Sequence, residues 1–242
     1  MPQAHPDGTP DGATAAGGRR SEFSRVAPEL ADAVAALAEP GMAIVAGPAG
    51  CGRTRLLTAV AAAFRGPVYS GGGLSMLRGS PGLALTRAVR AKLPAHDVPL
   101  CAEAVRSRVR GGLLVVDDLQ WCDAATLAAL PHLAATCRVV AALRTPHRLP
   151  ESAIAALRQH ALWIDVAPVD DDAAAELVRA AAPGLPEPGV TALVRRGGGN
   201  PLALESLARR AQARPDSATE AGDASPDTVH ALAEAVADLP RA

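Results

Sequence analysis

A glycine-rich loop at residues 47–54, with the sequence GPAGCGRT, carries the first pattern that could do chemistry. Its spacing is G-x-x-x-x-G followed by a basic and a hydroxyl residue, here Arg53 and Thr54. Glycines allow the backbone to curl so that successive N–H groups point inward, and a helix that starts there adds the positive end of its dipole. The loop is therefore suited to a polyphosphate, with the Thr54 hydroxyl as a ligand for Mg²⁺. The alternative is a tight strand-to-helix turn that needs glycine only for its shape.

A pair of acids at the end of an apolar run is the second such pattern. Asp117 and Asp118 follow LLVV at 113–116. Asp117 is placed to hold Mg²⁺ through water beside the phosphates, and Asp118 to orient or deprotonate an attacking water. Taken singly, two acids after a strand more commonly end it or cap the next helix. Together with the glycine loop they favour a polyphosphate with Mg²⁺ as the bound ligand.

The scaffold for these residues is predicted by the apolar pattern as alternating strands and helices. Strands are expected at 42–46, 67–70, 113–118, 138–143 and 162–166, and helices at 26–37, 53–64, 83–93, 100–108, 124–135 and 151–158. Such alternation implies a parallel sheet covered by helices on both faces. The strand at 113–118 is apolar on both faces, so we expect it at the centre of the sheet.

Beyond residue 168 the strand pattern ceases and helical segments follow at 171–181, 188–195 and 201–213. The predicted fold class is α/β, a three-layer sandwich with a central parallel sheet followed by a small all-helical lid. We place a disordered leader at 1–22, the core at 23–167, the lid at 168–214, and a linker with one terminal helix at 215–242. The run Gly71–Gly73 is either a flexible break or a close backbone approach.

Composition narrows the class of protein. The chain has 242 residues, of which 49% are hydrophobic and 20% charged, and a formal net charge of -1. No overall field attracts a polyanion or an anionic membrane, and Arg106, Arg108 and Arg110 are expected to form only a solvated helix face. Four widely spaced cysteines indicate reduced core thiols and neither a disulfide framework nor a zinc site. With no signal-like leader and no apolar run long enough to span a membrane, we expect a cytoplasmic protein.

Three segments together resemble the nucleotide-binding part of the STAND class of signalling NTPases, in particular the large ATP-binding LuxR-type transcriptional regulators. They are GPAGCGRT, LLVVDDLQWCD and GGNPLALESL. In that family the second segment contains two Asp, then Trp and Asp, which here are Asp117, Asp118, Trp121 and Asp123. We expect Trp121 to pack the acidic loop against the sheet. The resemblance implies a P-loop NTPase core of the AAA-like kind, and it runs from about residue 26 to the end.

The resemblance also implies roles for individual residues. Arg144 follows a strand, where the family has a sensor of the terminal phosphate, and Gly199-Asn200-Pro201 resembles the family's Gly-x-Pro element in the lid. Asp118 and Arg144 are the expected catalytic residues, and Thr54 and Asp117 the expected metal ligands. The expected nucleotide-binding residues are Gly47, Pro48, Ala49, Gly50, Cys51, Gly52, Arg53, Thr54, Arg55 and Pro201.

Three departures from the family qualify these expectations. Arg53 stands where the family has lysine, and a planar guanidinium differs geometrically from a point-like ammonium, so we expect hydrolysis to be weak or slow. The Gly-Arg-Glu element that commonly opens the family's ATPase is absent, so adenine contacts are not assigned. The chain ends at a segment resembling the entrance to the family's winged helix, and no DNA-reading module is visible in it.

Three functions are compatible with these patterns. The leading hypothesis is a nucleotide-dependent switch in which bound ATP or ADP biases the lid, and through it self-association or a partner protein. The second is an ATPase or phosphotransferase that turns over a substrate. The third is an interaction module that has kept the fold and binds no nucleotide.

Overall fold

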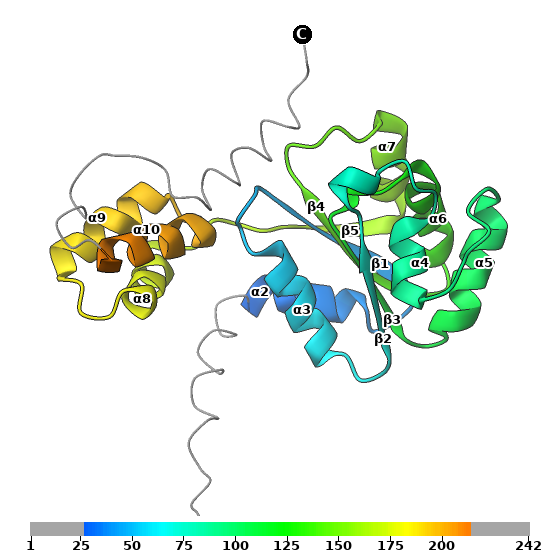
Figure 1. Ribbon diagram of the computed structural model, residues 1–242. Coiled ribbons are helices and arrows are strands. Elements are labelled where there is room, and N and C mark those ends of the chain that lie inside the picture. The colour runs from blue at the N-terminus through cyan, green and yellow to red at the C-terminus, as the bar shows by residue number, and fades with distance from the viewer. Residues whose placement is uncertain (1–26, 214–242) are drawn as a thin grey trace, which may run out of the picture.

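The computed structural model of this protein describes residues 27–213, in which five parallel strands form one sheet. They are β1 (Gly41–Gly47), β2 (Val68–Gly72), β3 (Leu113–Asp117), β4 (Arg138–Arg144) and β5 (Ala161–Asp165), in the spatial order β2-β3-β4-β1-β5 (Figure 1). The prediction that the strand at 113–118 is central was wrong, because β4 occupies the centre and β3 lies between β2 and β4. Burial on both faces marks any interior strand and does not distinguish the central one.

Helices cover both faces of the sheet, which confirms the predicted three-layer α/β fold (Figure 1). On one face lie α2 (Ala27–Ala36) and α3 (Arg53–Ala63), packed against the inward side chains Ala43 and Val45 of β1. The other face is covered by α4 (Leu83–Val89), α5 (Val98–Val109), α6 (Ala124–Ala134) and α7 (Glu151–His160), which enclose Met42 and Ile44 of the same strand. Alternate residues of β1 therefore serve two separate apolar cores.

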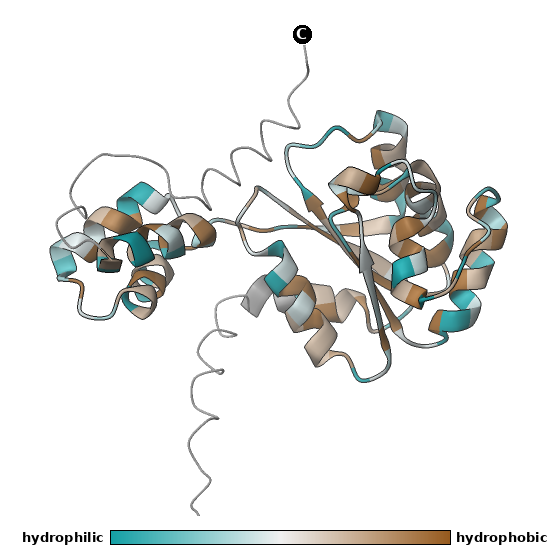
Figure 2. Ribbon diagram, in the orientation of Figure 1, coloured by the Kyte–Doolittle hydropathy of each residue, from teal (hydrophilic) through white to brown (hydrophobic). Residues whose placement is uncertain are grey.

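The three inner strands, β1, β3 and β4, are mostly apolar because both of their faces are buried. Figure 2 shows apolar residues concentrated on the strands and on the helices that flank them. Leu113, Leu114 and Val116 of β3 are fully buried, although they point alternately to the two cores. Burying one such side chain contributes about 2 kcal/mol, so the sheet and its flanking helices fix the carboxyl ends of the strands in place.

The glycines that follow residue 70 permit close backbone approaches, which is one of the two alternatives left open by the sequence. Gly71 and Gly72 belong to β2, two residues beyond the predicted strand. A Cβ on Gly71 would lie 2.1 Å from the carbonyl oxygen of Ala84 in α4. A Cβ on Gly73 would lie 2.5 Å from the backbone of Trp121. The glycines thus let α4 and the loop after β3 pack directly on the end of β2.

Three further helices form a small bundle with its own core, as the predicted fold class requires. They are α8 (Asp171–Ala181), α9 (Glu187–Gly197) and α10 (Pro201–Ala213), seen in yellow to orange in Figure 1. Val178, Leu193 and Leu204 are buried among them. The predicted leader at 1–22 and the linker and terminal helix at 215–242 lie outside the described residues. Among the helices of residues 27–213, none combines the length and the apolar character needed to cross a bilayer.

The four cysteines are buried and unpaired, as predicted for core thiols. Burial, with a smaller effect from the nearby Asp123 carboxylate, raises the pKa of Cys122 to about 12. Arg106 pairs with Glu103 at 2.6 Å on the exposed side of α5, in agreement with a solvated helix face.

Candidate functional site

The glycine loop lies at the carboxyl end of β1 and leads directly into α3. Gly50 and Gly52 have φ values of 78° and 101°, in the left-handed region that favours glycine. Gly52 is the residue that precedes the first turn of α3, and it provides no side-chain cap for the N–H groups of that turn. A Cβ added to Gly52 would meet nothing within 4 Å. Open space therefore faces a helix N-terminus, which is a suitable place for an anion.

Thr54 and Asp117 are brought together across 63 residues of sequence. The Thr54 hydroxyl donates a 2.8 Å hydrogen bond to Oδ2 of Asp117, and Oδ1 of Asp117 accepts one of 2.8 Å from the N–H of Asp118. Burial, and secondarily the Asp118 charge, raises the pKa of Asp117, while these two hydrogen bonds oppose the rise. A hydroxyl and a carboxylate side by side are the oxygen ligands that Mg²⁺ takes in proteins, so these residues fit that ion.

Asp118 lies just beyond β3 in the left-handed conformation, with φ 52° and ψ 54°. It precedes the short 3-10 helix η2 (Leu119–Trp121), which the sequence did not predict. Oδ1 of Asp118 accepts a 2.8 Å hydrogen bond from Nε2 of Gln120, and Oε1 of Gln120 accepts one of 3.0 Å from the N–H of Arg144. Gln120 is buried and joins the ends of β3 and β4.

Arg144 ends β4 directly beside the start of the glycine loop, because it is the partner of Gly47 in the parallel ladder. It is buried. Its guanidinium lies 5.3 Å from the centre of the Trp121 ring, and that of Arg78 lies 4.2 Å from the same ring. Trp121 thus packs on two cations at the carboxyl end of the sheet, where arginine and indole attract each other.

Asp123, the last residue of the second motif, has a structural position. Its carboxylate accepts hydrogen bonds from the N–H of Gly82 at 2.9 Å and from the N–H and hydroxyl of Thr126 at 3.0 and 2.7 Å. It caps α6 and ties the start of α4 to it. Asp123 therefore holds the end of the acidic loop against the starts of α4 and α6.

Arg53 folds back onto the loop that precedes it. One guanidinium nitrogen donates to the carbonyl oxygens of Gly47, at 2.5 Å, and of Pro48. The same nitrogen lies 3.7 Å from the buried thiol of Cys51. The cation expected to meet phosphate thus braces the loop's own backbone.

The N-terminus of α10 meets the glycine loop from the other side. Asn200 donates a 2.8 Å hydrogen bond from Nδ2 to the carbonyl oxygen of Ala49. The N–H of Leu202 donates one of 3.3 Å to the carbonyl oxygen of Gly50. A salt bridge of 2.9 Å joins Arg55 to Glu205. A cavity of about 240 Å³ lies at this junction. Its lining residues are Gly50, Gly52, Arg53, Thr54, Arg55, Pro201, Leu202 and Glu205.

Most of the residues expected to bind nucleotide line this cavity. The other expected residues of the loop, Gly47, Pro48, Ala49 and Cys51, are not part of its lining. Pro48 is exposed, Cys51 is buried, and Asp117 is reached through Thr54. Sequence reasoning missed Gln120, Asn200 and Glu205 as members of the site. Asn200 carried a usable signal, because Asn before Pro is typical of the start of a helix.

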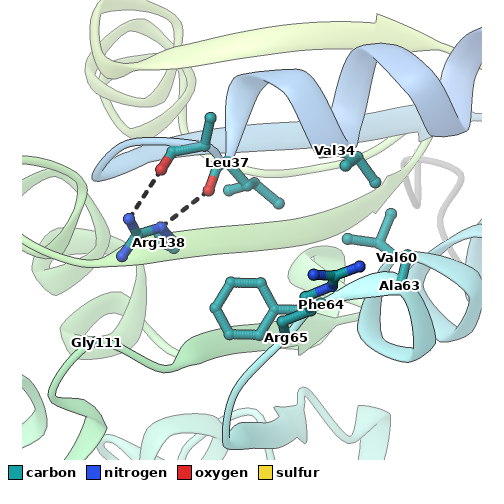
Figure 3. A pocket seen from close by; sticks show the side chains of 9 residues that line it. Val34, Leu37, Val60, Ala63, Phe64, Arg65, Gly111 and Arg138 are labelled. Carbon is teal, nitrogen blue, oxygen red and sulfur yellow. Dashed lines mark hydrogen bonds between the residues drawn. The ribbon is translucent and has the colours of Figure 1, made fainter.

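A separate apolar cavity of about 370 Å³ lies at the amino ends of the strands, away from the glycine loop (Figure 3). It is enclosed by the ends of α2 and α3, with Leu37 and Phe64 on its walls. Arg138 at its rim donates hydrogen bonds of 2.9 and 2.8 Å to the carbonyl oxygens of Leu37 and Ala38. These bonds satisfy the carbonyls of the two residues that follow α2, and the cavity lies apart from the glycine loop.

Comparisons with solved structures agree with this arrangement. The Drosophila origin recognition complex bound to DNA matches with a TM-score of 0.54 and 18% identity, over 90% of this chain and 61% of that one. The replication initiator DnaA bound to AMPPCP and single-stranded DNA matches with a TM-score of 0.53 and 14% identity, over 83% and 63%. The α/β fold therefore resembles that of P-loop ATPase domains. We call residues 47–54 the P-loop, after their sequence pattern.

A STAND protein with a tetratricopeptide repeat sensor from Pyrococcus horikoshii also matches, with a TM-score of 0.45 and 15% identity over 87% of this chain. The chain spans about a third of that protein's length, since it covers 32% of it. No family model matches the chain, and no curated protein matches it in sequence.

Proposed function

We propose that this P-loop domain binds Mg²⁺-ATP at the P-loop, beside the N-terminus of α10, and acts as a nucleotide-dependent signalling switch. The observation that carries the proposal is the 2.8 Å contact between the Thr54 hydroxyl and the Asp117 carboxylate, beside a helix N-terminus and a glycine loop. Two oxygen ligands next to an anion site are what a metal-phosphate complex requires. The fold shared with a DnaA that was solved with AMPPCP supports the same ligand class.

The residues of the site divide the tasks of binding phosphate, holding the metal and activating water. The N–H groups of the P-loop and of the first turn of α3 hold the phosphates, and Thr54 and Asp117 hold the metal. Magnesium, when bound, neutralises charge on the phosphate oxygens. Asp118 holds the attacking water, and Arg144, from the end of the neighbouring strand, senses the terminal phosphate.

The regulatory character of the switch follows from its contacts with the lid. Helix α10 touches the P-loop directly, so a change at the phosphates changes what the lid packs on. Arg53 braces the loop's backbone carbonyls, so we expect hydrolysis to be slow and the ATP state to be long-lived. The resemblance of the three sequence motifs to LuxR-type STAND regulators supports a role in transcriptional control, with the lid as the surface that acts on a partner or a second copy.

Calorimetric titration of ATP in the presence and absence of Mg²⁺ tests the proposal. The wild-type chain should bind ATP more tightly with Mg²⁺, and Asp117→Ala should lose that dependence. Asp165→Ala is a matched control, because Asp165 is an exposed carboxylate that also ends a strand, β5, on the far side of β1. Equal Mg²⁺ dependence in the wild type and Asp117→Ala would refute the metal assignment. Absence of ATP binding by the wild type would refute the function itself.

A further inference from the structure

Helix α10 holds the P-loop by its backbone. Nδ2 of Asn200 donates to the carbonyl oxygen of Ala49 at 2.8 Å, and the N–H of Leu202 reaches the carbonyl oxygen of Gly50 at 3.3 Å. The two acceptors are successive carbonyls of the loop, and Ala49 lies 151 residues from Asn200 in the chain. Helix α10 of the lid is therefore hydrogen-bonded to two neighbouring peptide groups in the middle of the candidate phosphate site.

The orientation of these peptide groups follows from these hydrogen bonds. In a planar trans peptide the C=O and N–H bonds point in opposite directions. Carbonyls that are directed at α10 therefore turn the N–H groups of Gly50 and Cys51 away from it. Those N–H groups belong to the loop that would receive phosphate, so the contact with α10 limits how the loop can present its donors.

The approach is close enough to require glycine at position 50. A Cβ on Gly50 would lie 2.7 Å from Oδ1 of Asn200 and 2.8 Å from Cβ of Leu202. The other end of the Asn200 amide is also engaged, because Oδ1 accepts from the N–H of Ala203 at 3.2 Å and so caps α10. One side chain thus fixes both the start of α10 and the Ala49–Gly50 peptide.

We propose that Asn200 is a positioning residue that preorganises the P-loop for phosphate and couples the loop's shape to the position of the lid. The inference rests on the proposed function for its ligand, although the contact itself does not. Asn200 acts through the backbone of the loop, so its loss should weaken nucleotide binding while the fold stays intact. The coupling is reciprocal. A phosphate that reorients the Ala49–Gly50 peptide changes the strength of the hydrogen bonds between α10 and the P-loop.

Two substitutions remove the amide donor and keep the cap, one leaving no donor (Asp) and one leaving only a hydroxyl that lies one bond closer to the backbone (Ser). Asn200→Asp and Asn200→Ser both retain an oxygen that can accept from Ala203, since Asp, Asn and Ser are comparable helix caps. Neither side chain offers an N–H to the carbonyl oxygen of Ala49. The negative charge of the aspartate also repels that oxygen. We expect Mg²⁺-ATP affinity to fall by about tenfold, the effect of losing one such hydrogen bond. The melting temperature without nucleotide should stay near that of the wild type.

Asp170→Asn is the matched control, because Asp170 caps a different helix of the same lid, α8, by accepting a 2.7 Å hydrogen bond from the N–H of Ala173. It should bind Mg²⁺-ATP like the wild type. Hydrogen exchange without nucleotide supplies a second measurement, in which the amide of Leu202 should exchange faster in Asn200→Asp than in Asp170→Asn.

The outcomes separate this inference from the proposed function. Wild-type Mg²⁺-ATP affinity in both Asn200 variants overturns the positioning role and leaves the nucleotide function standing. If the wild-type chain binds no ATP, the proposed function fails, and hydrogen exchange alone decides the coupling. Unchanged exchange at Leu202 in Asn200→Asp then overturns the coupling of the lid to the loop.

Discussion

The side-chain amide of Gln120 donates a 2.8 Å hydrogen bond to the carboxylate of Asp118, two residues before it. The bond exists because Asp118 adopts the left-handed conformation and the chain then turns through η2, which brings Gln120 back beneath the end of β3. Its carbonyl oxygen accepts from the N–H of Arg144 at the end of β4. One buried amide therefore holds in place the two residues to which we assign water activation and phosphate sensing.

Replacing Gln120 should destabilise the fold and disturb the Asp118 carboxylate. Gln120→Leu leaves the Arg144 N–H and Asp118 without their partner, at a cost of roughly 2–4 kcal/mol. Gln120→Glu keeps an acceptor for Arg144 but sets a second carboxylate beside Asp118. The two carboxylates repel each other once both are ionised, so this variant should lose stability relative to the wild type as the pH rises through the acid range. Chemical denaturation at several pH values measures both effects, and a pH-independent Gln120→Glu would contradict the second.

The ionised carboxylate of Asp117 should lower the free energy of unfolding of the metal-free protein at neutral pH. Burial and the Asp118 charge raise its pKa in the folded state. A carboxyl whose folded pKa lies above the unfolded value contributes stability below the unfolded pKa and loses it as the pH rises through the folded pKa. Asp117→Asn should therefore melt above the wild type at neutral pH without Mg²⁺, and the difference should shrink as the pH falls. The exposed Asp165→Asn is the control. A lower melting temperature of Asp117→Asn at neutral pH would contradict the expectation.

Much of the fold could be predicted because apolar runs, glycine loops and helix patterns are local signals. The strands at 42–46, 113–118 and 138–143 were found within one or two residues of their observed bounds. Parallel strands present their carboxyl ends at one edge, so the proximity of Thr54 and Asp117 also followed. The order of the strands depends on which apolar faces meet, and composition alone could not distinguish β4 from β3 as the centre.

The contacts that shape the candidate site were harder to foresee. Gln120 depends on a left-handed residue at Asp118, a conformation that is uncommon for residues other than glycine. The bond from Asn200 to Ala49 depends on how two separately folded parts meet. Arg53 was expected to face phosphate, yet its guanidinium finds acceptors in the carbonyls of its own loop. Side-chain direction in each case is decided by tertiary packing, which leaves no periodic trace in the sequence.

Asp123 should matter for stability far more than an ordinary helix cap. It is nearly buried and accepts three hydrogen bonds, from Gly82 and from two atoms of Thr126. Asp123→Ala removes the cap of α6 and leaves the Gly82 N–H buried, for a loss of roughly 2–4 kcal/mol.

Asp97→Ala is the matched control for Asp123→Ala, because Asp97 caps α5 through a single exposed bond to Leu100. It should cost about 1 kcal/mol. Loss of the Asp123 charge should also lower the pKa of Cys122 and speed its alkylation. Equal losses in the two alanine variants, measured by chemical denaturation, would show that Asp123 is only a cap.

Arg53→Lys should raise the rate of ATP hydrolysis. The guanidinium of Arg53 donates to the carbonyls of Gly47 and Pro48, so it must leave those acceptors before it can meet a phosphate. A lysine ammonium is compact and mobile, and it reaches the β- and γ-phosphates from this position in other P-loops. We expect kcat to rise about tenfold, which corresponds to about 1.4 kcal/mol of barrier. Arg108→Lys is the control, since it makes the same chemical change on the exposed side of α5, where the guanidinium donates to the carbonyl oxygen of Ala104. If phosphate release is unchanged by Arg53→Lys under saturating Mg²⁺-ATP, the slow step lies elsewhere, and Arg53 is not what prolongs the ATP state.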